Sequence, residues 1–85
     1  MISGWRADID SLSFQPHGHA GQCLIHRGAF KTILGFDPTP DECMACFQQR
    51  LAAFEAAAAG KIARERLGAD ANFHLNSRDV LRAVG

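Results

Sequence analysis

The chain has 85 residues, with nine Lys or Arg against nine Asp or Glu, so its formal net charge is zero. This balance argues against the strongly basic surface of a nucleic-acid-binding protein, and a hydrophobic fraction of 47% argues against a disordered chain. We therefore expect a single domain over residues 1–85, with residues 1–10 as a loosely ordered N-terminal segment. A chain this short buries only about 60% of its unfolded surface, so a partner subunit would add stability.

Cysteine usage and hydropathy bear on the compartment. Three cysteines cannot all pair within one chain, which favours a reducing environment. Asp8 and Asp10 lie where a signal peptide would carry its apolar run. No stretch approaches the roughly 20 apolar residues that a membrane-spanning helix needs. The sequence therefore predicts a cytoplasmic protein that does not span a membrane.

Three short segments show the alternation of apolar and polar residues that is typical of half-buried strands. Residues 11–15 and 22–26 alternate in this way, and the turn residues at 16–19 predict that they form a hairpin. Residues 72–75 alternate again. We therefore expect a third strand there.

The strongest local signal marks the start of a helix. Thr39 can cap it, Pro40 suits its first position, and Glu42 can complete a capping box. Apolar residues then recur at spacings of three and four, which places them in one stripe; they are Met44, Phe47, Leu51, Phe54 and Ala58. The sequence predicts one long helix from Pro40 to about Leu67, capped by Gly68, whose last two turns leave the core.

Two shorter helices complete the expected fold. One is expected near residues 28–34 with Gly35 as its left-handed cap, and one at residues 77–83 with Asn76 or Ser77 as its cap. The predicted fold class is α+β: a small antiparallel sheet of about three strands packed on one long helix, with two short helices, in the order β-β-α-α-β-α. The expected core consists of Phe14, Cys23, Ile25, Phe30, Ile33, Leu34, Phe47, Leu51, Phe54, Phe73 and Leu75.

The cysteines suggest a metal site, and the expected structure argues against it. Cys43 and Cys46 form a C-x-x-C pair, and Cys23 and His26 have the same spacing, so a Cys3His zinc site is one hypothesis. A regular strand would point Cys23 and His26 to opposite faces of the sheet. Cys43 and Cys46 would lie within a helix, whereas structural zinc sites prefer a C-x-x-C pair on a tight turn. We expect Cys23 and Cys43 to pack as small apolar core side chains and Cys46 to lie at the edge of the apolar stripe, so that the thiols neither bind metal nor act as a redox dithiol.

The histidines carry no recognisable catalytic arrangement. His17 and His19 lie in the predicted turn and are expected to be exposed to solvent, although a metal or phosphate could bind there. His26 and His74 are expected on the sheet face opposite the apolar one. We find no carboxylate pair, Ser-His-Asp set or glycine-rich phosphate loop, so the sequence predicts no catalytic residue, no metal and no cofactor.

Basic residues gather weakly along the long helix. Lys61, Arg64 and Arg66 follow Arg50 by a few turns, but acidic residues interrupt the run and a helix C-terminus accounts for the last two arginines. We expect a solvated face, with weak nucleic-acid binding through Lys61, Arg64 and Arg66 as an alternative.

Two segments carry a resemblance to a known family. The segment CFQQRLAAFEAAA at residues 46–58, followed by FHLNSRDV at 73–80, resembles a small bacterial family called domain of unknown function 1488. The resemblance covers about residues 12–80, and the chain departs from the family in a shorter hairpin and in its Cys43–Cys46 pair. It implies a compact cytoplasmic α+β domain, and it transfers no catalytic role because the family has no established activity.

The expected fold leads to a functional hypothesis. A sheet this small has unpaired edges and an open face, which favours self-association through an edge strand or through the alanines at 56–59. The predicted partner is a second copy of the chain or another protein, and the sequence leaves open whether a small molecule binds. The rival hypothesis is a zinc module using Cys23, Cys43, Cys46 and a histidine.

Overall fold

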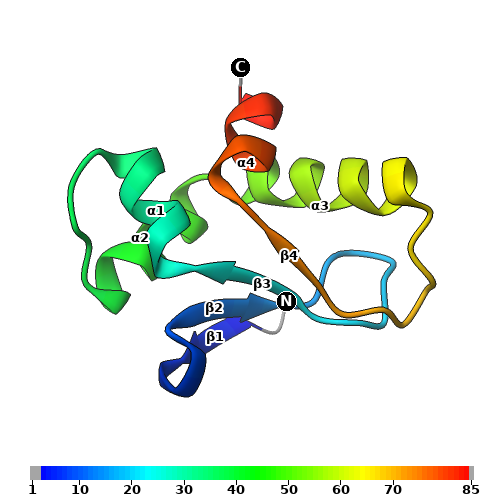
Figure 1. Ribbon diagram of the computed structural model, residues 1–85, viewed down its shortest axis with the longest axis horizontal. Helices are drawn as coiled ribbons and strands as arrows, with labels where there is room; N and C mark the ends of the chain where they lie inside the picture. The colour runs from blue at the N-terminus through cyan, green and yellow to red at the C-terminus, as the bar shows by residue number, and fades with distance from the viewer. Residues whose placement is uncertain (1–2, 85) are drawn as a thin grey trace.

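A computed structural model describes residues 3–84 of the chain. Its strands are β1 (Ser3–Arg6), β2 (Ser11–Phe14), β3 (Cys23–His26) and β4 (Phe73–Leu75). Its helices are the short 3-10 helix η1 (Ala7–Ile9) and the α-helices α1 (Arg27–Leu34), α2 (Pro40–Gln49), α3 (Leu51–Glu65) and α4 (Ser77–Val84). Figure 1 shows α3 and α4 above the strands and α1 and α2 to their left.

The expected α+β class is confirmed, but the predicted sheet is wrong in strand number and direction. The described residues form one four-stranded sheet in the order β1-β2-β3-β4. The β1–β2 and β2–β3 pairs are antiparallel, whereas β3 and β4 are parallel. Three helices connect β3 to β4, so the chain returns to the same end of the sheet before it enters β4. Alternation along a strand carries no information about the direction of its neighbour.

The strand that the sequence did not predict is β1. It pairs with β2 from Ser3 opposite Phe14 to Arg6 opposite Ser11, and η1 then turns the chain into β2. The expected loose segment over residues 1–10 is therefore wrong for residues 3–10, while residues 1–2 lie outside the described part. Trp5 is the one large apolar residue in β1, and alternation is not recognisable with a single apolar residue.

The predicted long helix is two helices. It begins at Pro40 as expected, but Arg50 leaves helical geometry with φ −119° and ψ 33°, which separates α2 from α3. A straight helix from residue 40 to residue 67 would be about 42 Å long, whereas the longest extent of the molecule is 33 Å. The bend keeps Phe47 and Phe54 on the same core, with ring centroids 5.3 Å apart.

The ends of the helices follow local rules at most positions. Thr39 and Glu42 form the predicted capping box, and Gly35 takes the left-handed conformation with φ 82° after α1. The amide of Asp79 donates to the side chain of Asn76, which confirms that cap. The exception is α3, where Arg66 adopts the left-handed conformation with φ 53° instead of Gly68.

One hydrophobic core lies between a single face of the sheet and the helices. Eight of the eleven expected core residues are buried, whereas Ile33, Leu34 and Leu51 are only half-buried against it. The buried hydrophobic residues missing from that list are Leu12, Cys43, Cys46, Ala57, Ala58 and Val80, although Cys43 was separately expected to pack as a small core side chain. The fully buried residues of α3 end at Ala58, but Ile62 and Leu67 beyond it are half-buried against the core, so the expectation that the last two turns leave the core is only partly correct.

Candidate functional site

The two edges of the sheet differ in which backbone groups face outward. The amide of Arg27 donates to the carbonyl of Asp10, which defines one hydrogen-bonded pair between β2 and β3. Such pairs alternate along antiparallel strands, so Leu12 and Phe14 bond to β3 while Ser11 and Ser13 bond to β1.

On β1, the partners of these two serines are Arg6 and Gly4. The intervening residues, Ser3 and Trp5, therefore direct their N–H and C=O groups away from the sheet. Among the described residues, no side chain forms a hydrogen bond with these four groups. β1 thus offers an open edge.

β4 forms the opposite edge, which is partly covered. The amide of Phe73 donates to the carbonyl of Gln22, so Phe73 and Leu75 bond to β3 and His74 faces outward. The Nζ atom of Lys61 donates to the carbonyl of His74 at 2.6 Å. A lysine at this position protects a strand edge from further pairing.

Asp79 holds Lys61 on the β4 edge. Its carboxylate accepts from Nζ of Lys61 at 3.3 Å and from Arg64 at 3.4 Å. The side chains of Lys61 and Asp79 are only 17% and 9% exposed. Burial raises the pKa of Asp79, but the amide of Asn76 and the charge of Lys61 outweigh burial, so the pKa lies below its usual value. Asp79 is therefore ionised at neutral pH, and the pair is fixed in place.

Few residues protect the β1 edge. It contains neither Lys nor Pro, and its one charged residue, Arg6, pairs with Asp8 at 2.7 Å. This ion pair is highly exposed and lies at the end of β1, so it leaves Ser3 and Trp5 open. A Cβ atom placed on Gly4 would have no neighbouring atom within 4 Å, so the space around this part of β1 is open.

The alanine surface proposed from the sequence is divided between the core and solvent. Within α3, Ala57 and Ala58 lie on the buried face, whereas Ala56 and Ala59 are exposed. Two of the four alanines therefore fill the core, so this run offers less exposed surface than the sequence suggested.

The three cysteines lie in the core, as expected for Cys23 and Cys43, whereas Cys46 was expected at the edge of the apolar stripe. Cys23, Cys43 and Cys46 are all buried and free of disulfides. Burial raises the pKa of the Cys43 thiol to about 11, and it also raises the pKa values of the other two thiols. Within residues 3–84, no three His, Cys, Asp or Glu side chains are grouped closely enough to hold a metal ion. The structure thus offers no grouped ligand set for the zinc hypothesis in the described part of the chain.

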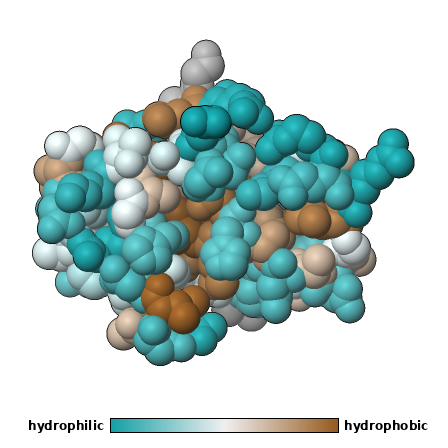
Figure 2. Space-filling model, viewed as in Figure 1, coloured by the Kyte–Doolittle hydropathy of each residue, from teal (hydrophilic) through white to brown (hydrophobic). Residues whose placement is uncertain are grey.

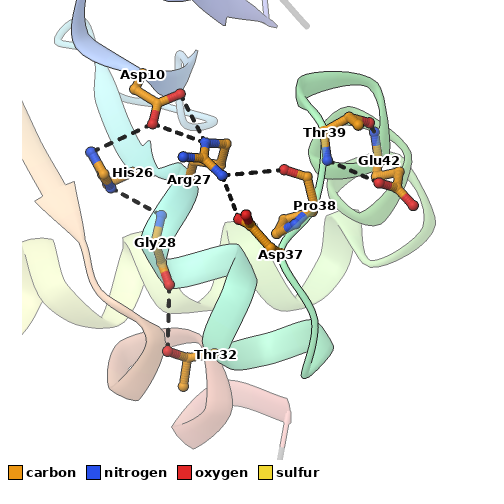
Figure 3. Close-up of polar contacts among 9 residues, drawn as sticks. All are labelled: Asp10, His26, Arg27, Gly28, Thr32, Asp37, Pro38, Thr39 and Glu42. Atoms are coloured by element: carbon orange, nitrogen blue, oxygen red, sulfur yellow. Dashed lines mark hydrogen bonds and ion pairs between the residues drawn. The ribbon is translucent and has the colours of Figure 1, made fainter.

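His26, the fourth ligand of that hypothesis, caps α1 instead. Figure 3 shows its Nδ1 atom accepting from the amide of Gly28, at 2.9 Å, while Nε2 faces Asp10 at 4.0 Å. The same close-up shows Arg27 bridging Asp10 and Asp37, so it ties the start of α1 to the loop before α2. These contacts are structural, and they supply the helix cap that the sequence analysis did not find.

Of the two histidines in the turn at residues 16–19, His17 agrees with the expectation and His19 does not. His17 is exposed, as predicted, and its amide donates to Glu55 at 3.1 Å. His19 is buried, with Nε2 2.7 Å from the carbonyl of Ala71 and its ring 5.5 Å from that of Phe73. The prediction of an exposed His19 is wrong, because the loop before β4 folds over the turn.

The predicted basic cluster is dispersed. The side chain of Lys61 is largely buried and pairs with the carboxylate of Asp79. Arg64 pairs with the same carboxylate, and Arg66 follows the last residue of α3. Asp79 thus partly neutralises Lys61 and Arg64, while no described carboxylate pairs with Arg66, so the nucleic-acid alternative keeps one fully free charge of three.

A hollow opens at the carboxyl ends of the parallel strands β3 and β4. It has a volume of about 420 Å³, and His26, Lys61 and His74 are among its lining residues. Figure 2 shows apolar atoms in a hollow near the centre of the face, where the end of β4 lies beside α1 in Figure 1. Small ligands often bind at such ends of parallel strands. Here, however, Asp79 already neutralises Lys61, so the hollow offers no free fixed charge from that residue.

No described helix is long and apolar enough to cross a membrane. Comparison of the chain with protein-family models, with curated proteins and with solved structures gave no match in any of the three. The resemblance to the domain of unknown function 1488 family therefore stays a prediction.

Proposed function

We propose that this chain is a non-catalytic, cytoplasmic interaction domain that forms a homodimer by pairing the β1 strands of two copies. The observation that carries the proposal is the difference between the sheet edges. Ser3 and Trp5 present four outward backbone groups on β1, whereas Lys61 occupies the outward carbonyl on β4.

A two-fold axis through paired β1 strands makes the interface self-complementary. Antiparallel pairing extends each four-stranded sheet into one continuous eight-stranded sheet, with both helical layers on the same side. Each copy satisfies its own outward groups with those of its partner. Trp5, half-buried on the core side of β1, would then lie near the partner's β1 and lose further exposed surface.

A matched pair of proline substitutions tests the proposal. Ser3→Pro removes an outward N–H from the β1 edge, and His74→Pro removes one from the β4 edge, so neither removes a hydrogen bond within the sheet. Light scattering behind a sizing column should find wild type and His74→Pro dimeric at tens of micromolar. Ser3→Pro should raise the dimer Kd by at least about tenfold, which is the loss expected from one or two hydrogen bonds.

Hydrogen exchange gives a second measurement that needs no variant. The amide of Trp5 should exchange more slowly as protein concentration rises, whereas the amide of His74 should exchange at a constant rate. A monomer from about 1 to 200 µM would overturn the proposal. A dimer sensitive to His74→Pro but not to Ser3→Pro would assign the interface to β4 instead.

A further inference from the structure

A groove runs along the surface where α3 packs against α4. One hollow of about 420 Å³ is lined in part by Arg50, Ala53 and Ala56. A second hollow, of about 220 Å³, is lined in part by Arg64 and Arg82. Ala56 and Ala83 line both hollows, so the two lie next to each other along α3 and α4, and together we call them the α3–α4 groove. From residue 50 to residue 64 the groove follows α3 for about 21 Å, which matches about four turns of a helix.

The two hollows are lined by small residues of both helices. α3 contributes Ala53, Ala56 and Gly60, and α4 contributes Ala83. None of these residues has a side chain longer than a methyl group, so the backbone of a guest helix could approach closely. An amphipathic helix laid into an apolar groove is a recurring mode of protein recognition.

The rim of the groove is positively charged. Arg50 borders one end, and Arg64 and Arg82 border the other. Among the described residues, no carboxylate pairs with Arg50 or Arg82. The one acidic lining residue, Asp79, is nearly buried and shares its charge between Lys61 and Arg64, so Arg50 and Arg82 carry most of the free positive charge of the rim. Residues 43–85 hold six of the nine Lys and Arg but four of the nine Asp and Glu, so this half of the chain has a net positive charge.

We propose that the α3–α4 groove binds an acidic amphipathic helix of a partner protein. The helix places small apolar residues on the alanine floor, and its Asp or Glu side chains, about four turns apart, meet Arg50 at one end and Arg64 with Arg82 at the other. This site is separate from the β1 edge, which lies below the helices in Figure 1. Binding at the groove and pairing at β1 can therefore fail or succeed independently.

The binding experiment uses a synthetic peptide and the full chain. The probe is a fluorescein-labelled 18-residue helical peptide with an Ala and Leu stripe and Glu residues at both ends, followed by fluorescence anisotropy at low salt. Wild-type protein should bind it, and replacing every Glu of the peptide by Gln should weaken binding by at least about tenfold. Binding should also weaken as salt rises, because exposed charge pairs are screened.

Matched variants localise the binding. Arg82→Glu reverses a charge on the rim, and Arg78→Glu makes the same change at an exposed position of α4 that does not line either hollow. Arg82→Glu should weaken binding by at least about tenfold, and Arg78→Glu by less than about threefold. Because both variants alter the net charge equally, this difference would locate the contact at the rim of the groove.

A second pair tests the floor of the groove. Ala56→Arg fills the groove, whereas Ala59→Arg places the same side chain at an exposed position on α3 that lines neither hollow. Only the first should abolish binding, and circular dichroism checks that each variant is folded. No binding of the peptide, or equal losses within both pairs, would overturn the proposal. So would a single-stranded oligonucleotide that binds more tightly than the peptide and is lost with Arg82→Glu, since that result would assign the groove to nucleic acid.

Discussion

The two edges of the sheet are built in opposite ways. β4 is a three-residue strand whose outward carbonyl is bound by Lys61, and Asp79 fixes that lysine. β1 is a four-residue strand whose outward groups meet no described side chain, and its only charged residue pairs with Asp8. Unprotected strand edges in natural proteins are sites of pairing with another chain. This difference between the two edges is the basis on which we propose pairing at β1.

The same contrast extends to the backbone next to each edge. Gly21 lies where a Cβ atom would collide with the carbonyl groups of Ala71 and Asp70, whereas Gly4 has open space around it. The β4 side is therefore packed against the loop that precedes it, and the β1 side is not.

The largest expected effect follows from this difference in packing. Gly21→Ala should destabilise the fold by more than about 3 kcal/mol, because its methyl group would overlap main-chain atoms that cannot move without disturbing the start of β4. Gly4→Ala should change stability by less than about 0.5 kcal/mol. Urea unfolding measures both, and similar midpoints for the two variants would contradict the difference between the two sides.

A smaller effect is expected when the protection of β4 is removed. Lys61→Met deletes the hydrogen bonds from Nζ to the carbonyl of His74 and to Asp79. It should cost about 2 kcal/mol, the usual contribution of hydrogen bonds to a charged group. Because both edges are then open, the variant should also form species larger than a dimer, which light scattering would detect. Arg66→Met, a change at an exposed position, is the control.

The smallest effect concerns the carboxylate that holds Lys61. Because the pKa of Asp79 is lower in the folded state, its stabilisation is fully present above the usual Asp pKa of 3.8 and is lost as the pH falls through the folded value. At pH 7, Asp79→Asn should lower the free energy of unfolding by about 1 kcal/mol. The difference from wild type should shrink below about pH 4, as urea unfolding at several pH values would measure. A difference that stays constant down to pH 2 would show that the charge of Asp79 does not matter.

Prediction from sequence succeeded where a few neighbouring residues decide the structure. The capping box of Thr39 and Glu42, the left-handed Gly35 and the cap at Asn76 all formed as expected. Alternation located β2, β3 and β4 for the same reason, because a strand with one buried face reveals itself over four or five residues. The burial of Cys23 also followed from its place on the apolar face of β3.

The failures involve residues that are far apart in the chain. His19 is buried because the carbonyl of Ala71, 52 positions later, lies 2.7 Å from its ring. The predicted helix breaks at Arg50, where φ is −119° and ψ is 33°, although the apolar pattern of its residues is continuous through the break. For the candidate site, the sequence named edge strands in general, but it could not say which strands form the edges or that β1 exists.

Local composition was sufficient for the class of fold, most of its helices and strands, and the placement of Cys23 and Cys43 in the core. Caps, turns and alternation act within about four residues, so their information is present in any short stretch of the chain. The open β1 edge and the closed β4 edge depend on folding in three dimensions. Lys61 donates to the carbonyl of His74, 13 positions away, because the fold brings α3 close to β4. Asp79, in the first turn of α4, lies near enough to pair with the same lysine. No pattern of neighbouring residues specifies the contacts of Lys61 with His74 and Asp79, because they depend on how the packed helices lie against the sheet.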